Sequence, residues 1–262
     1  MKKKDPGQLA KYTECIQQLS IADMDCSLYL PPDYEQGSSR YPVIYVNGEI
    51  AVEKMLTELV KSGVKTDFLL LSVKPASWND DFTPWSAPAF CREEQAPQGR
   101  ADVYLAKLIG EIKPYMDANF RTKPEPQDTA LFGYSLGGLT AVYAIYVTDV
   151  FGAVGSLSGS LWYDGFCEYM ESREPLRRDV RVYFSLGKKE SASRNPRMGM
   201  VADCTERAYR SLKNMDVSFE WNDGGHFHEI EKRFVRAFAW WVEGGCKDAP
   251  SYPSCAYRST PS

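Results

Sequence analysis

The stretch Leu131-Phe132-Gly133-Tyr134-Ser135-Leu136-Gly137-Gly138-Leu139 decides the fold class of this sequence. It contains the pattern Gly-x-Ser-x-Gly, with a strand predicted over residues 129–133 and a helix over 136–147. Small residues two positions to either side let the chain turn sharply at the serine without a collision. The context therefore predicts that Ser135 projects its hydroxyl as a nucleophile at the helix N-terminus, whereas a serine that only caps the helix is the alternative.

Strands and helices alternate along the rest of the chain. We expect strands at 21–30, 41–46, 67–73, 151–158, 180–186 and 217–221, and helices at 51–61, 100–120, 197–214 and 228–242. Residues 67–73 (DFLLLSV) are apolar on both faces, as in a central parallel strand. This order predicts an α/β fold with a mostly parallel central sheet and helices on both faces. A single domain is expected over residues 1–243, followed by an irregular tail over 244–262.

The bulk properties of the 262-residue chain exclude several classes of function. A net charge of −4 argues against nucleic acid as a partner, because phosphate binding needs a basic face. No apolar run approaches the length of a membrane span, so no membrane partner is predicted. Polar residues follow the opening lysines where a signal peptide needs an apolar segment. The expected location is therefore cytoplasmic, unless an export signal was removed.

The seven cysteines show no spacing typical of a zinc site. We expect them to be reduced thiols used as small apolar residues, and we predict no metal and no organic cofactor. A disulfide between Cys246 and Cys255 is the alternative if the protein is exported.

A serine nucleophile needs a base that accepts its proton. The chain has two histidines, His226 and His228, and both follow the last predicted strand. That position fits the chain order of an α/β hydrolase, in which the histidine comes after the serine and the acid. His226 follows the flexible Gly224-Gly225 and is the favoured base, whereas His228 is expected to begin the final helix.

The acid that orients the histidine is expected in a loop between residues 135 and 226, after a strand. Residues 180–186 (VRVYFSL) run directly into Gly-Lys-Lys-Glu, which places Glu190 in such a loop. A solvated surface carboxylate is the alternative interpretation of Glu190. Asp164, Asp203 and Asp223 are the weaker candidates for the same role.

Together these motifs resemble the putative-esterase branch of the α/β hydrolases, which includes siderophore (enterochelin) esterases, S-formylglutathione hydrolases and feruloyl-type carbohydrate esterases. The likeness covers most of the chain, residues 21–243, and is similar above all to the siderophore-esterase-like subgroup. Its marks are LPPDY at 30–34, YPVIY at 41–45, DFTP at 81–84, GYSLGG at 133–138, GKKE at 187–190 and Gly-His at 225–226. The resemblance implies an α/β-hydrolase fold with Ser135, Glu190 and His226 as the catalytic triad.

An oxyanion hole needs two N–H donors, and the N–H of Leu136 is the first one expected. Relatives in this branch commonly carry Asp-Gly after the strand that corresponds to 41–46, in the loop that supplies the second donor. Here the loop reads Val46-Asn47-Gly48-Glu49 and is one residue shorter. Gly48 and Glu49 are therefore the two candidates for the second donor.

The long loop after residue 73 indicates which kind of ester the protein is expected to bind. Siderophore-esterase-like members tend to carry an arginine shortly before the Asp-x-Thr-Pro segment, and this sequence has Trp78 near that place. An anionic catecholate would lose a charged anchor, so a small or aromatic ester is the expected substrate. The aromatic residues of this loop and of the loop after 158 are either a wall of the substrate site or ordinary packing: Trp78, Phe82, Trp85, Trp162 and Tyr163.

The predicted function is hydrolysis of a small-molecule carboxylic ester through an acyl-enzyme. Acyl transfer on the same triad is one alternative, since only the acceptor differs. A catalytically silent binding module is the other, because a fold does not fix a function. The sequence makes no prediction of the oligomeric state.

Overall fold

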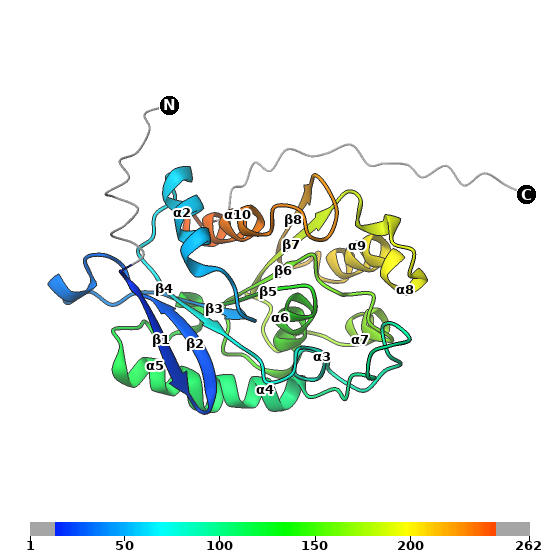
Figure 1. The fold of residues 1–262 in the computed structure, drawn as a ribbon, viewed down its shortest axis with the longest axis horizontal. Helices are drawn as coiled ribbons and strands as arrows, with labels where there is room; N and C mark the ends of the chain where they lie inside the picture. Colours follow the sequence, from blue (N-terminus) through cyan, green and yellow to red (C-terminus); the bar gives the residue numbers. More distant parts are fainter. Residues whose placement is uncertain (1–13, 245–262) are drawn as a thin grey trace, which may run out of the picture.

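One eight-stranded sheet crosses the part of the chain that the computed structural model describes, residues 14–244 (Figure 1). The strand order is β1-β2-β4-β3-β5-β6-β7-β8. From β4 through β3 to β8 the neighbouring strands are parallel, whereas β1 and β2 form an antiparallel hairpin at one edge. The predicted α/β class and the mostly parallel sheet are confirmed.

The strands lie close to the predicted ranges, with one strand in addition. They are β1 (Ile16–Ile21), β2 (Met24–Tyr29), β3 (Val43–Asn47), β4 (Leu69–Val73), β5 (Thr129–Tyr134), β6 (Ala153–Leu157), β7 (Arg181–Gly187) and β8 (Asp216–Asn222). The helices are α2 (Val52–Ser62), α3 (Trp78–Asp81), α4 (Ala101–Lys107), α5 (Lys113–Asn119), α6 (Leu136–Val147), α7 (Phe166–Glu171), α8 (Pro196–Gly199), α9 (Val201–Ser211) and α10 (Ile230–Val242).

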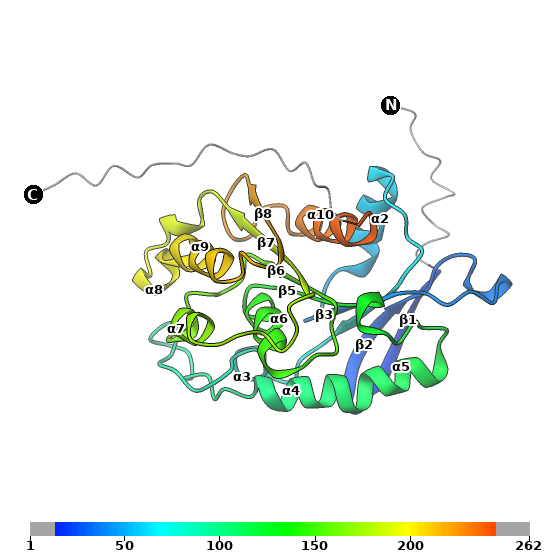
Figure 2. The ribbon, with the colours of Figure 1, turned by 180° about the vertical axis from the view of Figure 1, so that it is seen from behind.

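Helices cover both faces of the sheet, and each face has its own apolar core (Figures 1 and 2). Helices α2 and α10 cover one face, and α4, α5, α6, α7 and α9 cover the other. Successive side chains of β3 point to opposite faces of the sheet. Val43 and Tyr45 pack on the α6 side, and Ile44 and Val46 pack on the α10 side. This alternation follows from the two-residue period of a strand, and both faces are buried because helices cover them.

The first strand was not expected from the sequence. It lacks the regular alternation of buried and exposed side chains that predicts a strand, since Gln17, Gln18 and Ser20 are all exposed at the edge of the sheet. The turn to β2 uses Ala22 and Asp23, both with positive φ angles (53° and 59°). Such a turn normally carries Asn-Gly, so the usual sequence signal of a hairpin was missing.

Two predicted helices are interrupted in the structure. The range 100–120 contains a π-helical turn, Leu108–Ile112, between α4 and α5. The range 197–214 divides into α8 and α9, with a break at Met200. The last helix begins at Ile230, so the expectation that His228 starts it is wrong by two residues.

Two expectations fall on residues outside 14–244. The predicted tail lies there almost entirely, and so do both cysteines of the alternative disulfide, Cys246 and Cys255. Within residues 14–244, no helix combines the length and the apolar character needed to cross a membrane.

We predict that Phe238→Ala lowers the free energy of unfolding by about 3–5 kcal/mol, because it leaves a cavity under α10. The Phe238 side chain is fully buried and packs against Phe68, Phe132 and Phe234, with ring centroids 6.3, 5.2 and 5.7 Å away. Urea unfolding measures the change. The control is Val103→Ala on α4, where the side chain is 56% exposed and a change within about 0.5 kcal/mol is expected.

Candidate active site

Ser135 lies between β5 and α6 in a backbone conformation that side chains rarely adopt, with φ 55° and ψ −121°. The turn is tight because Gly133 and Gly137 meet backbone to backbone: a Cβ on Gly133 would lie 2.2 Å from the Gly137 carbonyl carbon. The Ser135 N–H donates to the Leu157 carbonyl at 3.0 Å, which ties the turn to β6. The two glycines therefore let the chain present the hydroxyl at the carboxyl edge of the sheet.

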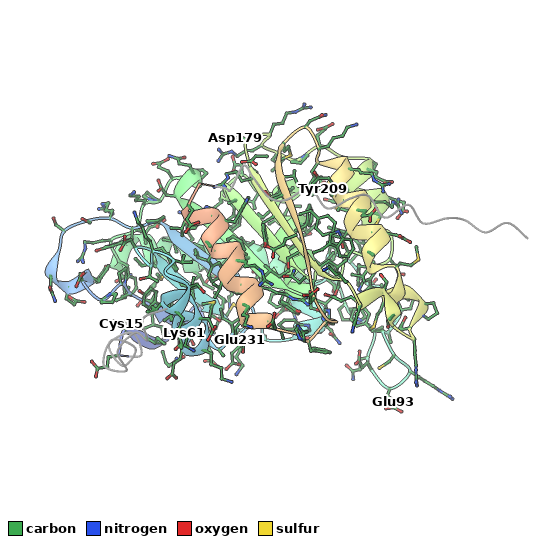
Figure 3. All side chains as sticks on the ribbon, turned by 90° about the horizontal axis from the view of Figure 1, so that it is seen from above. Cys15, Lys61, Glu93, Asp179, Tyr209 and Glu231 are labelled. Atoms are coloured by element: carbon green, nitrogen blue, oxygen red, sulfur yellow. The ribbon has the colours of Figure 1, made fainter. Side chains whose placement is uncertain are left out.

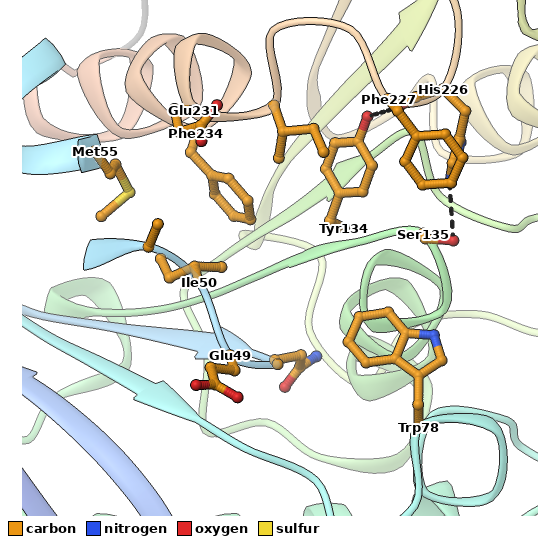
Figure 4. Close-up of a pocket in the computed structure, with 14 residues that line it drawn as sticks. Glu49, Ile50, Met55, Trp78, Tyr134, Ser135, His226, Phe227, Glu231 and Phe234 are labelled. Carbon is orange, nitrogen blue, oxygen red and sulfur yellow. Dashed lines mark hydrogen bonds between the residues drawn. The ribbon is translucent and has the colours of Figure 1, made fainter. Parts of the chain in front are cut away.

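His226 comes from the loop between β8 and α10, and its ring lies beside Ser135 (Figure 4). The Nε2 atom is 3.1 Å from Ser135 Oγ. Burial raises the pKa of Tyr134 to about 12, so its hydroxyl stays protonated and donates to the His226 carbonyl. The imidazole side chain is 31% exposed, which leaves room for a substrate to reach it.

Glu190 follows β7 and accepts from the second nitrogen of the imidazole. Its Oε2 is 2.8 Å from His226 Nδ1, so the expected contact between these two residues is present. Its Oε1 accepts from the Gly187 N–H at 2.7 Å and from the Ser158 hydroxyl at 2.7 Å. With one oxygen held by the protein frame, the other is fixed toward the histidine.

Arg233, on α10, is a site residue that the sequence did not reveal. Its side chain is fully buried, and its Nη1 donates to Glu190 Oε1 at 2.8 Å, to Tyr134 Oη at 3.2 Å and to the Ser158 hydroxyl. Its Nη2 donates to the Gly225 carbonyl at 2.8 Å. A buried arginine needs such partners, and a buried carboxylate needs a cation. Arg233 and Glu190 therefore stabilise each other in their buried positions.

Two opposing effects set the pKa of Glu190. Burial disfavours the ionised form, but the four hydrogen bonds described above outweigh it and lower the pKa below its ordinary value of 4.5. Glu190 is therefore ionised at neutral pH. In the neutral imidazole, the tautomer that pairs with this carboxylate carries its proton on Nδ1 and leaves the lone pair of Nε2 facing Ser135.

The structure decides between the two candidates for the second N–H donor. The Gly48 N–H donates to the Val73 carbonyl at 2.9 Å, so the expectation for Gly48 is wrong: the β3–β4 ladder continues into this residue. Among the described residues, the N–H of Glu49 has no acceptor, and Leu136 is the first residue of α6, where helical N–H groups are unpaired. Leu136 and Glu49 remain the candidates.

A cavity of about 460 Å³ opens beside Ser135 and His226. It runs between the loop after β3, the start of α2 and the start of α10 (Figure 4). Most of its wall is apolar, formed by Ile50, Ala51, Met55, Phe227, Ile230 and Phe234. Trp78 lies across from His226 at the Ser135 end.

Of the five aromatic residues that were candidates for a wall of the substrate site, only Trp78 lines this cavity. Phe82 and Tyr163 are fully buried. Trp85 packs in a cluster with Tyr163 and Phe166, and Trp162 packs edge-on against Phe90 at 5.5 Å. For these four the packing alternative is correct: Trp85, Trp162 and Tyr163 pack the long loop against α7 and the loop before it, whereas Phe82 packs edge-on against Tyr104 of α4 at 4.9 Å.

The weaker candidates for the acid lie away from the imidazole. Asp164 pairs with Arg197, Asp223 pairs with Lys188 at 2.8 Å, and Asp203 lies within α9. His228 is half exposed, and its Nδ1 is 4.0 Å from Glu229. Across residues 14–244, no group of three or more His, Cys, Asp or Glu side chains is placed to hold a metal ion.

A parallel sheet, a serine on a strand-to-helix turn and a histidine after the last strand define an α/β hydrolase. The chain belongs to the esterase family whose model, described as "Putative esterase", matches residues 20–241. It is accordingly an enzyme, a serine hydrolase that acts on ester bonds.

Three known proteins illustrate the similarity. "Uncharacterized protein YbbA" of Bacillus subtilis (strain 168) is 27% identical over 226 residues, which cover 82% of this chain and 90% of that protein. The siderophore hydrolase EstA from Aspergillus nidulans superposes with a TM-score of 0.69 at 16% identity, covering 94% of this chain and 99% of that one. The enterobactin esterase FES from Shigella flexneri, solved in the presence of enterobactin, gives 0.70 at 16% identity, covering 87% and 59%.

We predict that the stabilising effect of Glu190 disappears in acid. A carboxylate whose pKa is lowered on folding stabilises the folded state fully above its ordinary pKa of 4.5, and this stabilisation is lost as the pH falls through the folded-state value. The difference in unfolding free energy between the wild type and Glu190→Gln is therefore largest near pH 7 and shrinks below pH 4.5. Urea unfolding at a series of pH values measures it, with exposed Glu111→Gln as the control for lost charge. A difference that stays constant with pH would contradict the assignment.

Proposed function

We propose that the chain hydrolyses a small-molecule carboxylic ester through an acyl-enzyme, with Ser135, His226 and Glu190 as the triad. The observation that carries the proposal is the line of contacts from Ser135 Oγ to His226 Nε2 at 3.1 Å and from His226 Nδ1 to Glu190 Oε2 at 2.8 Å. Nucleophile, base and orienting acid need this order and these distances.

In the first half of the reaction, Ser135 Oγ attacks the carbonyl carbon of the ester while its proton moves to His226 Nε2. The negative charge on the carbonyl oxygen is stabilised by the N–H groups of Leu136 and Glu49. Ionised Glu190 stabilises the imidazolium that forms. The bond to the alcohol then breaks, the alcohol leaves with the proton from His226, and the acyl group remains on Ser135.

In the second half, water replaces the alcohol. His226 accepts a proton from the water, whose oxygen attacks the acyl carbon. The bond to Ser135 Oγ breaks, the proton returns to Ser135 and the carboxylic acid is released. The 31% exposure of the His226 side chain supports this step, because the water has to reach Nε2 while the acyl group occupies Ser135.

The names of two structural relatives support a small-molecule ester as the substrate, since they are a siderophore hydrolase and an enterobactin esterase. The cavity beside Ser135 also has the size of a small-molecule site, which is typically about 300–1,000 Å³.

Labelling with a fluorophosphonate tests the nucleophile, because the probe reacts only with a serine that has an activating base and an oxyanion hole. We expect one adduct, on Ser135, that is absent from Ser135→Ala and His226→Ala. Ser135→Ala should also lower turnover of p-nitrophenyl acetate by roughly three to six orders of magnitude. An adduct on another serine, or a well-folded wild type that is not labelled, would contradict the proposal.

The two histidines provide a matched pair of variants. We expect His226→Ala to abolish turnover of p-nitrophenyl acetate, because it removes the group in contact with Ser135. His228→Ala should keep most of the activity, because the His228 side chain is half exposed and lies beside Glu229, with Nδ1 4.0 Å from its carboxylate. Steady-state kinetics of both variants measure the difference, and equal losses would contradict the assignment of the base.

A further inference from the structure

We infer that the cavity between α2 and α10 selects esters by charge: it binds an apolar part of the ester that carries no negative charge. The inference rests on the proposed function, since it takes Ser135 as the attacking group.

The shape of the cavity supplies the first argument. It extends from Ser135 and His226 toward Met55 and Phe234, so a group bonded to the reacting carbonyl can enter it (Figure 4). Its polar side chain Asn47 is already satisfied: Nδ2 donates to the Gly137 carbonyl at 2.9 Å and Oδ1 accepts from Tyr104 at 3.0 Å. Apart from the carboxylates of Glu49 and Glu231, the wall away from Ser135 thus offers apolar contact, which suits an alkyl or aryl group.

Phe227 adds apolar surface at the entrance. Its side chain is 84% exposed, although it lines the cavity and its ring meets the His226 ring edge-on at 4.9 Å. When an apolar ligand binds beside Ser135, it would remove this exposed ring from water. That burial favours binding of the ligand. Each methylene that enters the cavity is expected to raise kcat/KM about fourfold.

Charge supplies the second argument. The charged side chains of the lining belong to Glu49 and Glu231, and no Lys or Arg of the described chain contributes to it. Glu49 is partly neutralised by Lys74 at 3.6 Å. Glu231 is half buried at the N-terminal end of α10 (Figure 3). Within residues 14–244 no Lys or Arg lies within ion-pair distance of it. An anionic group in this cavity would lose its hydration and meet a second carboxylate.

Two matched pairs of esters test the inference and tell the acyl side from the alcohol side. The acyl pair is p-nitrophenyl hexanoate and the p-nitrophenyl half-ester of adipic acid. The alcohol pair is hexyl acetate and 6-acetoxyhexanoate, followed by titration of the acid released. In each pair a terminal methyl group is replaced by a carboxylate. For the pair whose chain enters the cavity, we expect kcat/KM to be at least about 100-fold higher for the neutral ester.

Variants connect the selectivity to the cavity. Glu231→Gln should reduce the preference for the neutral ester about tenfold, and Glu231→Lys should reduce it further. Glu111→Gln is the control, since it removes the same charge from an exposed position on the opposite face of the sheet and should leave the preference unchanged. Ile50→Trp should lower kcat/KM for the neutral ester of the pair whose chain enters the cavity, because the larger side chain fills the cavity.

The outcomes separate the inference from the proposed function. Normal fluorophosphonate labelling of Ser135 with no preference in either pair, or with a preference for the anionic ester, would overturn the inference alone. A preference that Glu231→Gln does not change would also overturn it, because the selection would then lie elsewhere. Absence of labelling and of all turnover would instead contradict the proposed function.

Discussion

The ion pair between Glu190 and Arg233 is the contact on which the geometry of the site depends. It joins the loop after β7 to α10, and both side chains are buried. Because removing one partner of a buried pair costs about 3–5 kcal/mol, neither group holds its position well without the other. Arg233 also contacts the Gly225 carbonyl and the Tyr134 hydroxyl. One guanidinium thus fixes the acid, the loop that carries the histidine and the residue before the serine.

The same helix connects the chemistry to the binding of substrate. Ile230, Phe234 and Phe238 lie four residues apart, so they form one stripe along α10. The first two line the cavity and the third lies in the core beneath it. Arg233, one position before Phe234, points instead into the site. A shift of α10 along its axis would therefore disturb the acid and the cavity together.

The sequence predicted those parts of the site that depend on local pattern. Gly-x-Ser-x-Gly placed Ser135, and the ends of β7 and β8 placed Glu190 and His226, because parallel strands end at one edge of the sheet. The sequence did not identify Arg233 as a site residue, because an arginine in an amphipathic helix is normally expected to be solvated. Only the fold shows that this one is buried. Gly48 was misjudged because the reach of the β3–β4 ladder depends on pairing between distant segments. The role of the aromatic residues was left open for a similar reason, since the sequence does not say which side of a long loop faces the core.

The late position of α10 in the chain has a consequence for how the enzyme is made. During synthesis the segment that carries Ser135 leaves the ribosome well before the segment that carries Arg233, and N-terminal parts of a chain are free to fold first. A nascent chain that lacks α10 has its serine, but Glu190 has no buried cation and the wall of the cavity is open. Completion of α10 is then the step that supplies the buried cation beside Glu190 and closes the wall of the cavity.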